Sequence, residues 1–160
     1  MCAENTTFKT CCFIGHRAIE ETEELREAVR ELVELLVSEQ GVDTFLFGSR
    51  SQFNSLCYEL VSEIKIKSPH IRRVYVRAEF EHISDSYKAY LLRDYEDTYF
   101  PEKVKGAGRA SYIKRNFEMI DKSEFCVFCF DESKTRRGKS GTKIALDYAR
   151  KRSRRVFNIL

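Results

Sequence analysis

The stretch EFCVFCFDESKTRRGKSGTKIALDYAR, residues 124–150, carries the pattern that decides the fold. It opens with a continuous apolar run, residues 125–130, of the composition expected for a strand that is buried on both faces. A short polar and basic loop follows, and apolar residues then recur at helical spacing from Ile144 to Ala149. This order predicts a strand, a loop and a helix that begins near Ser140.

The start of this predicted helix is made of small and hydroxylic residues, Ser140-Gly141-Thr142. The first turn of a helix leaves N–H groups without partners and carries the positive end of the helix dipole, so it suits a phosphate or a carboxylate. Lys139 and Lys143 add positive charge at the same place. Serine is also an ordinary N-cap, so a connection without any ligand would have the same sequence. Both interpretations stay open on this stretch alone.

The rest of the chain alternates between strand and helix patterns in the same way. Strands are expected at residues 8–14, 44–47, 73–76 and 155–160, and helices at residues 21–40 and 53–67 and in a segment that closes at 116–121. The helix at 21–40 carries an apolar stripe of Leu25, Val29, Leu32, Val33 and Leu36, and Gly41 is placed to end it. We therefore expect one α/β domain over residues 1–160, a Rossmann-like three-layer αβα domain with a mainly parallel sheet.

Polar clusters follow three of the predicted strands. They are Gly15-His16-Arg17, Gly48-Ser49-Arg50, and the segment from Asp131 and Glu132 onward to Thr142. Ligands of such sheets bind beyond the carboxyl ends of the strands, so the three clusters are expected to converge on one site. The imidazole of His16 there either binds a ligand or acts as an acid or base, or it holds the loop.

Residues 78–111 interrupt the alternation as a long, irregular, aromatic-rich insertion with a short helix expected at 84–93. Its aromatic residues are Phe80, Tyr87, Tyr90, Tyr95, Tyr99 and Phe100. Three roles stay open for them: stacking on a base, forming an interface in a homo-oligomer, or packing the connection onto the domain.

Composition and charge narrow the function classes. No stretch approaches the ~20 apolar residues of a membrane-spanning helix, and residues 1–10 lack the pattern of a signal peptide, so a cytoplasmic protein with reduced cysteines is expected. Cys126 and Cys129 lie three apart in a strand and point to opposite faces, so they are expected to be core residues, with no metal site and no cofactor. The net charge of +3 is too small to indicate nucleic-acid binding by itself, although residues 134–139 and 150–155 are basic.

The segments CCFIGHR (11–17), YIKRNFEMIDKSEFCVF (112–128) and GTKIALDYA (141–149) together resemble the SLOG superfamily, and its YpsA-like branch in particular. The resemblance spans nearly the whole chain. It implies a Rossmann-like fold that binds a nucleotide or a nucleotide-derived, ADP-ribose-like compound, and it adds Arg115 and Asn116 to the expected site.

Two positions depart from the family pattern. The segment after the second strand usually has a further glycine and then an acid, where this chain has Gln52 and Asn54. Related enzymes that cleave N-glycosidic bonds carry a helical glutamate, such as the Lonely Guy-type phosphoribohydrolases with Gly-Gly-x-Gly-Thr-x-x-Glu, and alignment on Gly141-Thr142 puts Ala145 there. Alanine supplies neither charge nor nucleophile, which argues against an enzyme.

The resemblance thus favours a sensor or regulatory module with a nucleotide-type small molecule as its partner. In this hypothesis Asp131 serves the ribose hydroxyls, and Gly141, Thr142 and Lys143 serve the phosphate. One alternative is an N-glycosidic bond hydrolase or transferase that uses Asp131, Glu132 or His16 as its catalytic group. A second alternative is the binding of single-stranded DNA.

Overall fold

The computed structural model describes residues 8–134 and 140–160 and contains a six-stranded, fully parallel sheet. The strands are β1 (Thr10–Gly15), β2 (Thr44–Phe47), β3 (Arg72–Val76), β4 (Asp97–Tyr99), β5 (Phe125–Cys129) and β6 (Arg155–Asn158). Their spatial order is β4-β3-β2-β1-β5-β6. The chain therefore builds outward from β1 in one direction and returns to add β5 on the other side of β1, which creates a switch point between these two strands.

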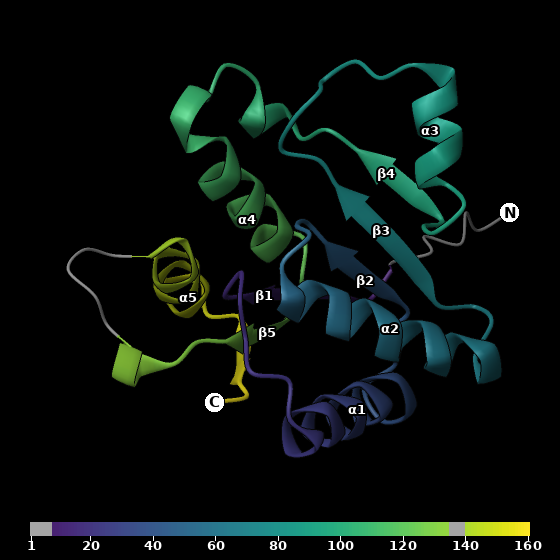
Figure 1. Cartoon of the computed structure of the whole chain (residues 1–160), viewed down its shortest axis with the longest axis vertical. Helices are drawn as coiled ribbons and strands as arrows, with labels where there is room; N and C mark the ends of the chain where they lie inside the picture. Colours follow the sequence, from purple (N-terminus) through teal and green to yellow (C-terminus); the bar gives the residue numbers. More distant parts are fainter. Residues whose placement is uncertain (1–7, 135–139) are drawn as a thin grey trace, which may run out of the picture.

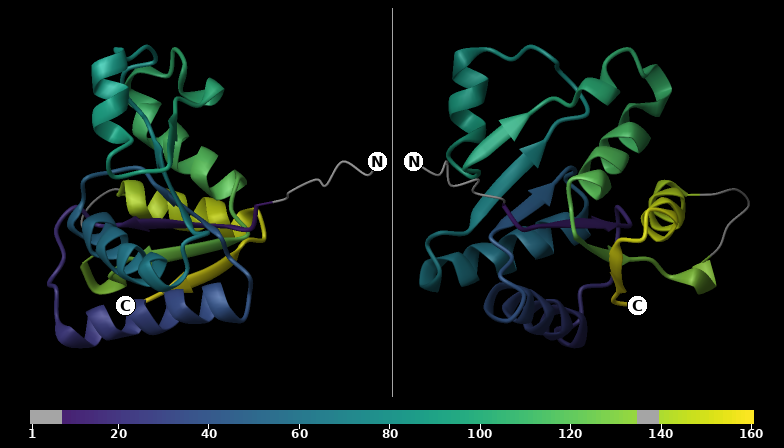
Figure 2. Two further views of the ribbon diagram at one scale, coloured as in Figure 1. Left: turned by 90° about the vertical axis from the view of Figure 1, so that its right-hand side faces the viewer. Right: turned by 180° about the vertical axis from the view of Figure 1, so that it is seen from behind.

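The α-helices of the described residues connect the strands. They are α1 (Glu23–Ser38), α2 (Gln52–Lys67), α3 (Asp85–Leu91), α4 (Ser111–Asp121) and α5 (Gly141–Lys151). The helices α1 and α2 pack on one face of the sheet, and α4 and α5 pack on the other (Figure 1). The side view separates these layers, with α3 at the end of the molecule near β3 and β4 (Figure 2). The predicted Rossmann-like three-layer αβα domain is confirmed.

The central strands are buried on both faces, as their apolar composition predicts. In β5, Phe125, Val127 and Cys129 belong to the core under α1 and α2, and Cys126 and Phe128 belong to the core under α4 and α5. Cys126 and Cys129 therefore lie on opposite faces, and the described residues contain no cluster of three potential metal ligands. Burial raises the pKa of the Cys11 and Cys57 thiols, which favours their protonated form.

The helix α1 has the amphipathic arrangement that its sequence predicts. Four residues of the expected stripe are buried, and Leu32 is partly buried against the same core. The Thr22 hydroxyl accepts a hydrogen bond from the Leu25 amide at 3.1 Å, and Gly41 has a left-handed φ of +71° just beyond the helix end.

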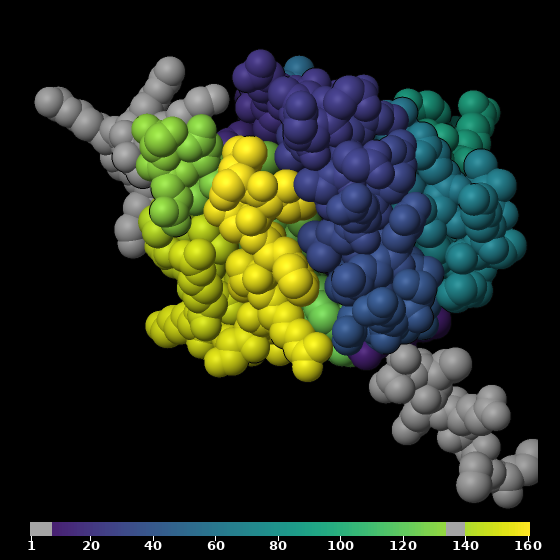
Figure 3. All heavy atoms as spheres, turned by 90° about the horizontal axis from the view of Figure 1, so that it is seen from below, coloured from purple at the N-terminus to yellow at the C-terminus, as the bar shows by residue number. Residues whose placement is uncertain are grey.

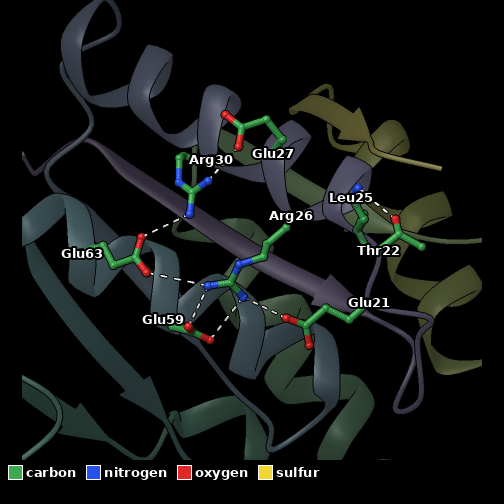
Figure 4. Close-up of polar contacts among 8 residues, drawn as sticks. All are labelled: Glu21, Thr22, Leu25, Arg26, Glu27, Arg30, Glu59 and Glu63. Carbon is green, nitrogen blue, oxygen red and sulfur yellow. Dashed lines mark hydrogen bonds and ion pairs between the residues drawn. The ribbon is translucent and has the colours of Figure 1, made fainter.

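On the outer side of α1, two arginines form ion pairs with glutamates of α1, of α2 and of the segment before α1 (Figure 4). Arg26 pairs with Glu21 at 2.8 Å and with Glu59 at 2.7 Å, and Arg30 pairs with Glu27 and Glu63. These pairs face solvent, so they fix how α1 lies on α2 more than they add to stability. On the same side of the molecule, the surface of α1 lies beside that of β6 (Figure 3).

Residues 78–111 are more regular than the sequence indicated. They contain α3, capped by Ser84 where a short helix was expected, and β4, which extends the sheet in register with β3. The strand β4 escaped prediction because its three residues form no apolar run. Across the described residues, no helix is long and apolar enough to cross a membrane.

Candidate functional site

A cleft of about 780 Å³ opens at the carboxyl ends of β1, β2 and β3, between these strand ends and the N-terminal parts of α4 and α5. Most of the predicted site residues line it, although they come from four separate segments of the sequence. These residues are Gly15, His16, Arg17, Gly48, Ser49, Arg50, Arg115, Asn116, Ser140, Gly141 and Thr142. The parallel topology brings them together because every contributing strand ends at the same edge of the sheet.

Arg115 on α4 is one of two buried guanidinium groups that line this cleft, and the other is Arg77. The side chain of Arg115 is buried, with the residue only 6% exposed, and Nη1 donates to the carbonyl oxygen of Gly48 while Nε donates to Asn116 Oδ1 at 3.3 Å. Both acceptors are neutral, and no carboxylate in the described part of the chain forms an ion pair with it. Burial accordingly lowers the pKa of Arg115. A buried guanidinium that lines a cleft and forms no ion pair with the described residues is suited to an anionic ligand.

The loop after β2 is held by the amide of Asn54, at the position where the SLOG pattern has an acid. Asn54 is 3% exposed; its Oδ1 accepts from the Gly48 amide and its Nδ2 donates to the Phe13 carbonyl, both at 3.2 Å. A carboxylate could accept the first bond but could not donate the second. The other departure, Gln52, lies on the outside and accepts a bond from the Ile19 amide at 2.8 Å. Both residues therefore stabilise the loops, and Asn54 also lines the cleft beside Gly48.

The loop after β1 crosses the switch point. The Asp131 amide donates to His16 Nε2 at 3.3 Å, and the His16 ring lies 5.4 Å from the ring of Phe130. His16 thus joins the ends of β1 and β5, which fits the loop-holding interpretation, while it also lines the cleft. A Cβ atom on Gly15 would lie 2.4 Å from the Phe53 ring, so this glycine allows α2 to pack against β1.

The N-terminus of α5 forms the opposite wall. The Ser140 hydroxyl caps the helix by accepting from the Lys143 amide at 3.1 Å, and Thr142 is buried at the wall of the cleft. A Cβ atom on Gly141 would meet no atom of the described residues within 4 Å, so these residues leave space beside this helix end. Ala145 lies one turn further and is 1% exposed in the core under α4 and α5, away from the cleft.

Three predicted residues are not among those lining the cleft: Asp131, Glu132 and Lys143. Asp131 Oδ1 accepts from the amide and the hydroxyl of Ser133 at 2.9 and 2.6 Å, so this carboxylate caps the short 3-10 turn Glu132–Lys134. Lys143 Nζ pairs with Asp147 at 2.9 Å and lies over the Phe130 ring. The expected roles of Asp131 on a ribose and of Lys143 on a phosphate are not supported by these contacts. Most of the basic segment 134–139 lies outside the described residues.

Four residues at the end of β3 and one at the start of α4 line the cleft without having been predicted as site residues: Tyr75, Arg77, Ala78, Glu79 and Tyr112. Phe80 and Tyr87, for which stacking on a base was one of the open roles, line it as well. The rule applied to the ends of the first two strands would have found Arg77, which directly follows β3, but no glycine marked this end as a site. Arg17, Arg50, Arg77 and Arg115 oppose a single carboxylate, Glu79, among the described lining residues.

The chain was also compared with known proteins. No model of a protein family and no curated protein matches it. The described residues of the cleft combine an excess of guanidinium groups, a helix N-terminus and the exposed aromatic rings of Phe80 and Tyr112. This arrangement can bind an anion joined to an apolar ring.

Proposed function

We propose that this protein binds a nucleotide or a nucleotide-derived, ADP-ribose-like compound in the cleft and acts as a sensor or regulatory module. The observation that carries the proposal is the buried guanidinium of Arg115 at the cleft wall, which has only neutral hydrogen-bond acceptors among the described residues. Burying a charge is unfavourable unless a counter-charge or hydrogen bonds compensate it. A phosphate bound in the cleft would supply both, with the paired geometry that guanidinium groups favour.

Other groups around the cleft support the same ligand class. The first turn of α5 presents backbone N–H groups, and Thr142 adds a hydroxyl at this wall. Arg17 and Arg50 are exposed at the ends of β1 and β2 and line the same cleft, where they raise the local concentration of an anionic ligand.

We further propose that the chain belongs to the SLOG superfamily, near its YpsA-like branch. The motifs that suggested it supply residues to one cleft: Gly15 to Arg17 after β1, Arg115 and Asn116 on α4, and Gly141 and Thr142 at the start of α5. The burial of Ala145 in the core supports binding without N-glycosidic cleavage, because the position of the catalytic glutamate of related enzymes is given to packing.

Thermal unfolding with added ATP, ADP, AMP and ADP-ribose tests the proposal, with adenosine as the uncharged reference. A ligand at 100 times its Kd adds about 2.7 kcal/mol of stability, which raises the Tm of a domain of this size by roughly 5–10 °C. Product analysis of the same samples should recover the nucleotide intact. Release of the free base from AMP would contradict the sensor interpretation.

The matched variants are Arg115→Met and Arg93→Met. Arg115→Met removes a buried charge and keeps most of the apolar volume, so the protein should still fold. We expect it to lose the nucleotide-induced shift, and Arg93→Met, an exposed arginine outside the cleft, to retain it in full. An unchanged shift in Arg115→Met would show that the buried guanidinium does not bind the ligand.

A further inference from the structure

One end of the cleft is an aromatic surface formed by Phe80, Tyr87 and Tyr112. Phe80 is 63% exposed and Tyr112 is 52% exposed. The ring of Tyr87 contacts the Phe80 ring edge-on at 6.4 Å and stacks on Tyr90 at 6.2 Å. The ring of Tyr112 is held by its hydroxyl, which donates to the carboxylate of Glu79. These rings are fixed at the cleft, yet two of them contribute little to the core.

The backbone at Phe80 is strained. Its φ of +60° lies in the left-handed region, which a bulky side chain rarely adopts and which glycine would adopt freely. Arg77 holds this turn, since its Nε donates to the Phe80 carbonyl at 3.3 Å and its Nη1 donates to Thr98 Oγ1 at 3.1 Å. Neither the backbone conformation nor packing in the core therefore explains why an aromatic residue is present at this position. Such strain is often kept for function at binding sites.

The aromatic surface and the cationic end of the cleft adjoin each other at Tyr112. The guanidinium carbon of Arg115 lies 5.4 Å from the centroid of the Tyr112 ring. The hydroxyl of Tyr112 donates a hydrogen bond to the carboxylate of Glu79, which precedes Phe80 in the sequence. At the aromatic end, the Arg77 guanidinium already donates to Phe80 and Thr98, and the Glu79 carboxylate repels a phosphate. A ligand with one anionic and one apolar part is therefore expected to place its anion at Arg115 and the start of α5.

We infer that the aromatic surface of Phe80, Tyr87 and Tyr112 binds the base of the nucleotide-type ligand, with its phosphate at Arg115 and the start of α5. The inference rests on the proposed function and makes it narrower. The ligand must therefore carry an aromatic ring. Sugar phosphates and inorganic phosphates would occupy only the phosphate part of the site. Phe80 supplies the stacking face and determines specificity for the ring.

The test compares ADP and ATP with ring-free anions, tripolyphosphate and ribose 5-phosphate, by calorimetric titration of the full chain. The decisive variant is Phe80→Gly, which relieves the backbone strain and removes an exposed side chain, so the variant should fold. Phe80→Trp tests rescue by another ring, and Phe8→Ala removes an exposed phenylalanine outside the cleft as a control.

We expect Phe80→Gly to weaken ADP and ATP binding about 5- to 150-fold, the equivalent of one base–aromatic stack, and to leave tripolyphosphate binding unchanged. Phe80→Trp and Phe8→Ala should bind ADP within about twofold of the unmodified protein, since a stacking ring remains in both. If ADP and tripolyphosphate bind equally well and Phe80→Gly alters neither, the inference fails while the proposed function stands. If none of these anions binds and ADP-ribose does not bind either, the proposed function fails.

Sedimentation of the same variants distinguishes a ligand-binding surface from an interface between copies of the chain. An aromatic surface can also be an interface between copies of this chain. If Phe80→Gly changes the oligomeric state and leaves ADP affinity intact, the surface is such an interface and the inference is overturned.

Discussion

The amide of Asn54 provides a sharp test of how the site loops are held. The change Asn54→Asp keeps the size of the side chain and the bond that the Gly48 amide donates to its oxygen. It removes the bond that Nδ2 donates to the carbonyl of Phe13 at 3.2 Å and places a second oxygen against that carbonyl. Since the residue is 3% exposed, water cannot replace the lost donor.

The free energy of unfolding should fall by about 1–3 kcal/mol, the cost of leaving a buried acceptor, the Phe13 carbonyl, without its hydrogen-bond donor. This loss of stability applies only while the introduced carboxyl group is ionised, because a protonated carboxyl group at this position could donate a hydrogen bond to the Phe13 carbonyl again. The folded-state pKa of the introduced aspartate is therefore raised above the ~3.9 of an unperturbed aspartate, by about one to two pH units. The positive charge of Arg115, bonded to Gly48 on the same loop, opposes this rise, so we expect the lower half of the range.

The sign with pH is fixed by proton linkage. Between the unfolded and folded pKa values the folded variant binds more protons, so its stability falls as the pH rises through this window. The loss should be complete at pH 7 and absent below about pH 4, when both are compared with the unmodified protein. Urea unfolding at pH 4, 5, 6 and 7 measures it.

Asn158→Asp is the matched control. Asn158 makes the same pair of bonds, to the amide and the carbonyl of Phe130, both at 3.0 Å, but it is only partly buried. Water can reach a carboxylate there, and the loss should be smaller. Equal stability of Asn54→Asp and the unmodified protein at pH 7 would refute the argument that the amide donor is required at this position.

Three further outcomes follow from burial and space in the structure. Leu36→Ala should cost ~2–5 kcal/mol because its side chain is fully buried, and the partly buried Leu32→Ala should cost less; equal losses in denaturant melts would contradict the orientation of α1. Gly15→Ala should cost ~1–3 kcal/mol, since its Cβ would lie 2.4 Å from the Phe53 ring, and Gly141→Ala, with open space, should leave the Tm within about 2 °C. Gly141→Asp should abolish the nucleotide-induced Tm shift because it places negative charge where the phosphate is proposed to bind, and a retained shift would contradict that placement.

The parts of the fold that could be predicted from the sequence are those whose pattern is local. The apolar run at residues 125–130 predicts β5 to within one residue, because a strand buried on both faces has few polar residues to obscure it. The strand β4 was missed because its pairing with Val74 to Val76 is set by the sheet and not by its own composition.

The candidate site also has features that the sequence predicts and features that it does not. Positions directly after β1 and β2 were predicted, because parallel strands end at one edge whatever their side chains do, but the same rule was not applied to Arg77 after β3. The orientations of the charged side chains could not be predicted. Asp131 and Lys143 lie beside the cleft in sequence, but Ser133 and Asp147 hold their charged groups elsewhere. Such partners depend on contacts within a turn or along a helix face that charge and spacing alone do not rank.

Gly48 and Arg115 show why this site is more than a set of strand ends. They are 67 residues apart, and a Cβ atom on Gly48 would lie 2.7 Å from Arg115 Cδ and 2.6 Å from Met119 Sδ. The glycine after β2 therefore has a packing role in addition to lining the cleft. It leaves space for the side chains of α4, and its carbonyl accepts a bond from the guanidinium that would otherwise be displaced from the wall. A sequence pattern marks this glycine as a turn residue, whereas its packing role is to leave room for a buried cation of α4 at the wall of the cleft.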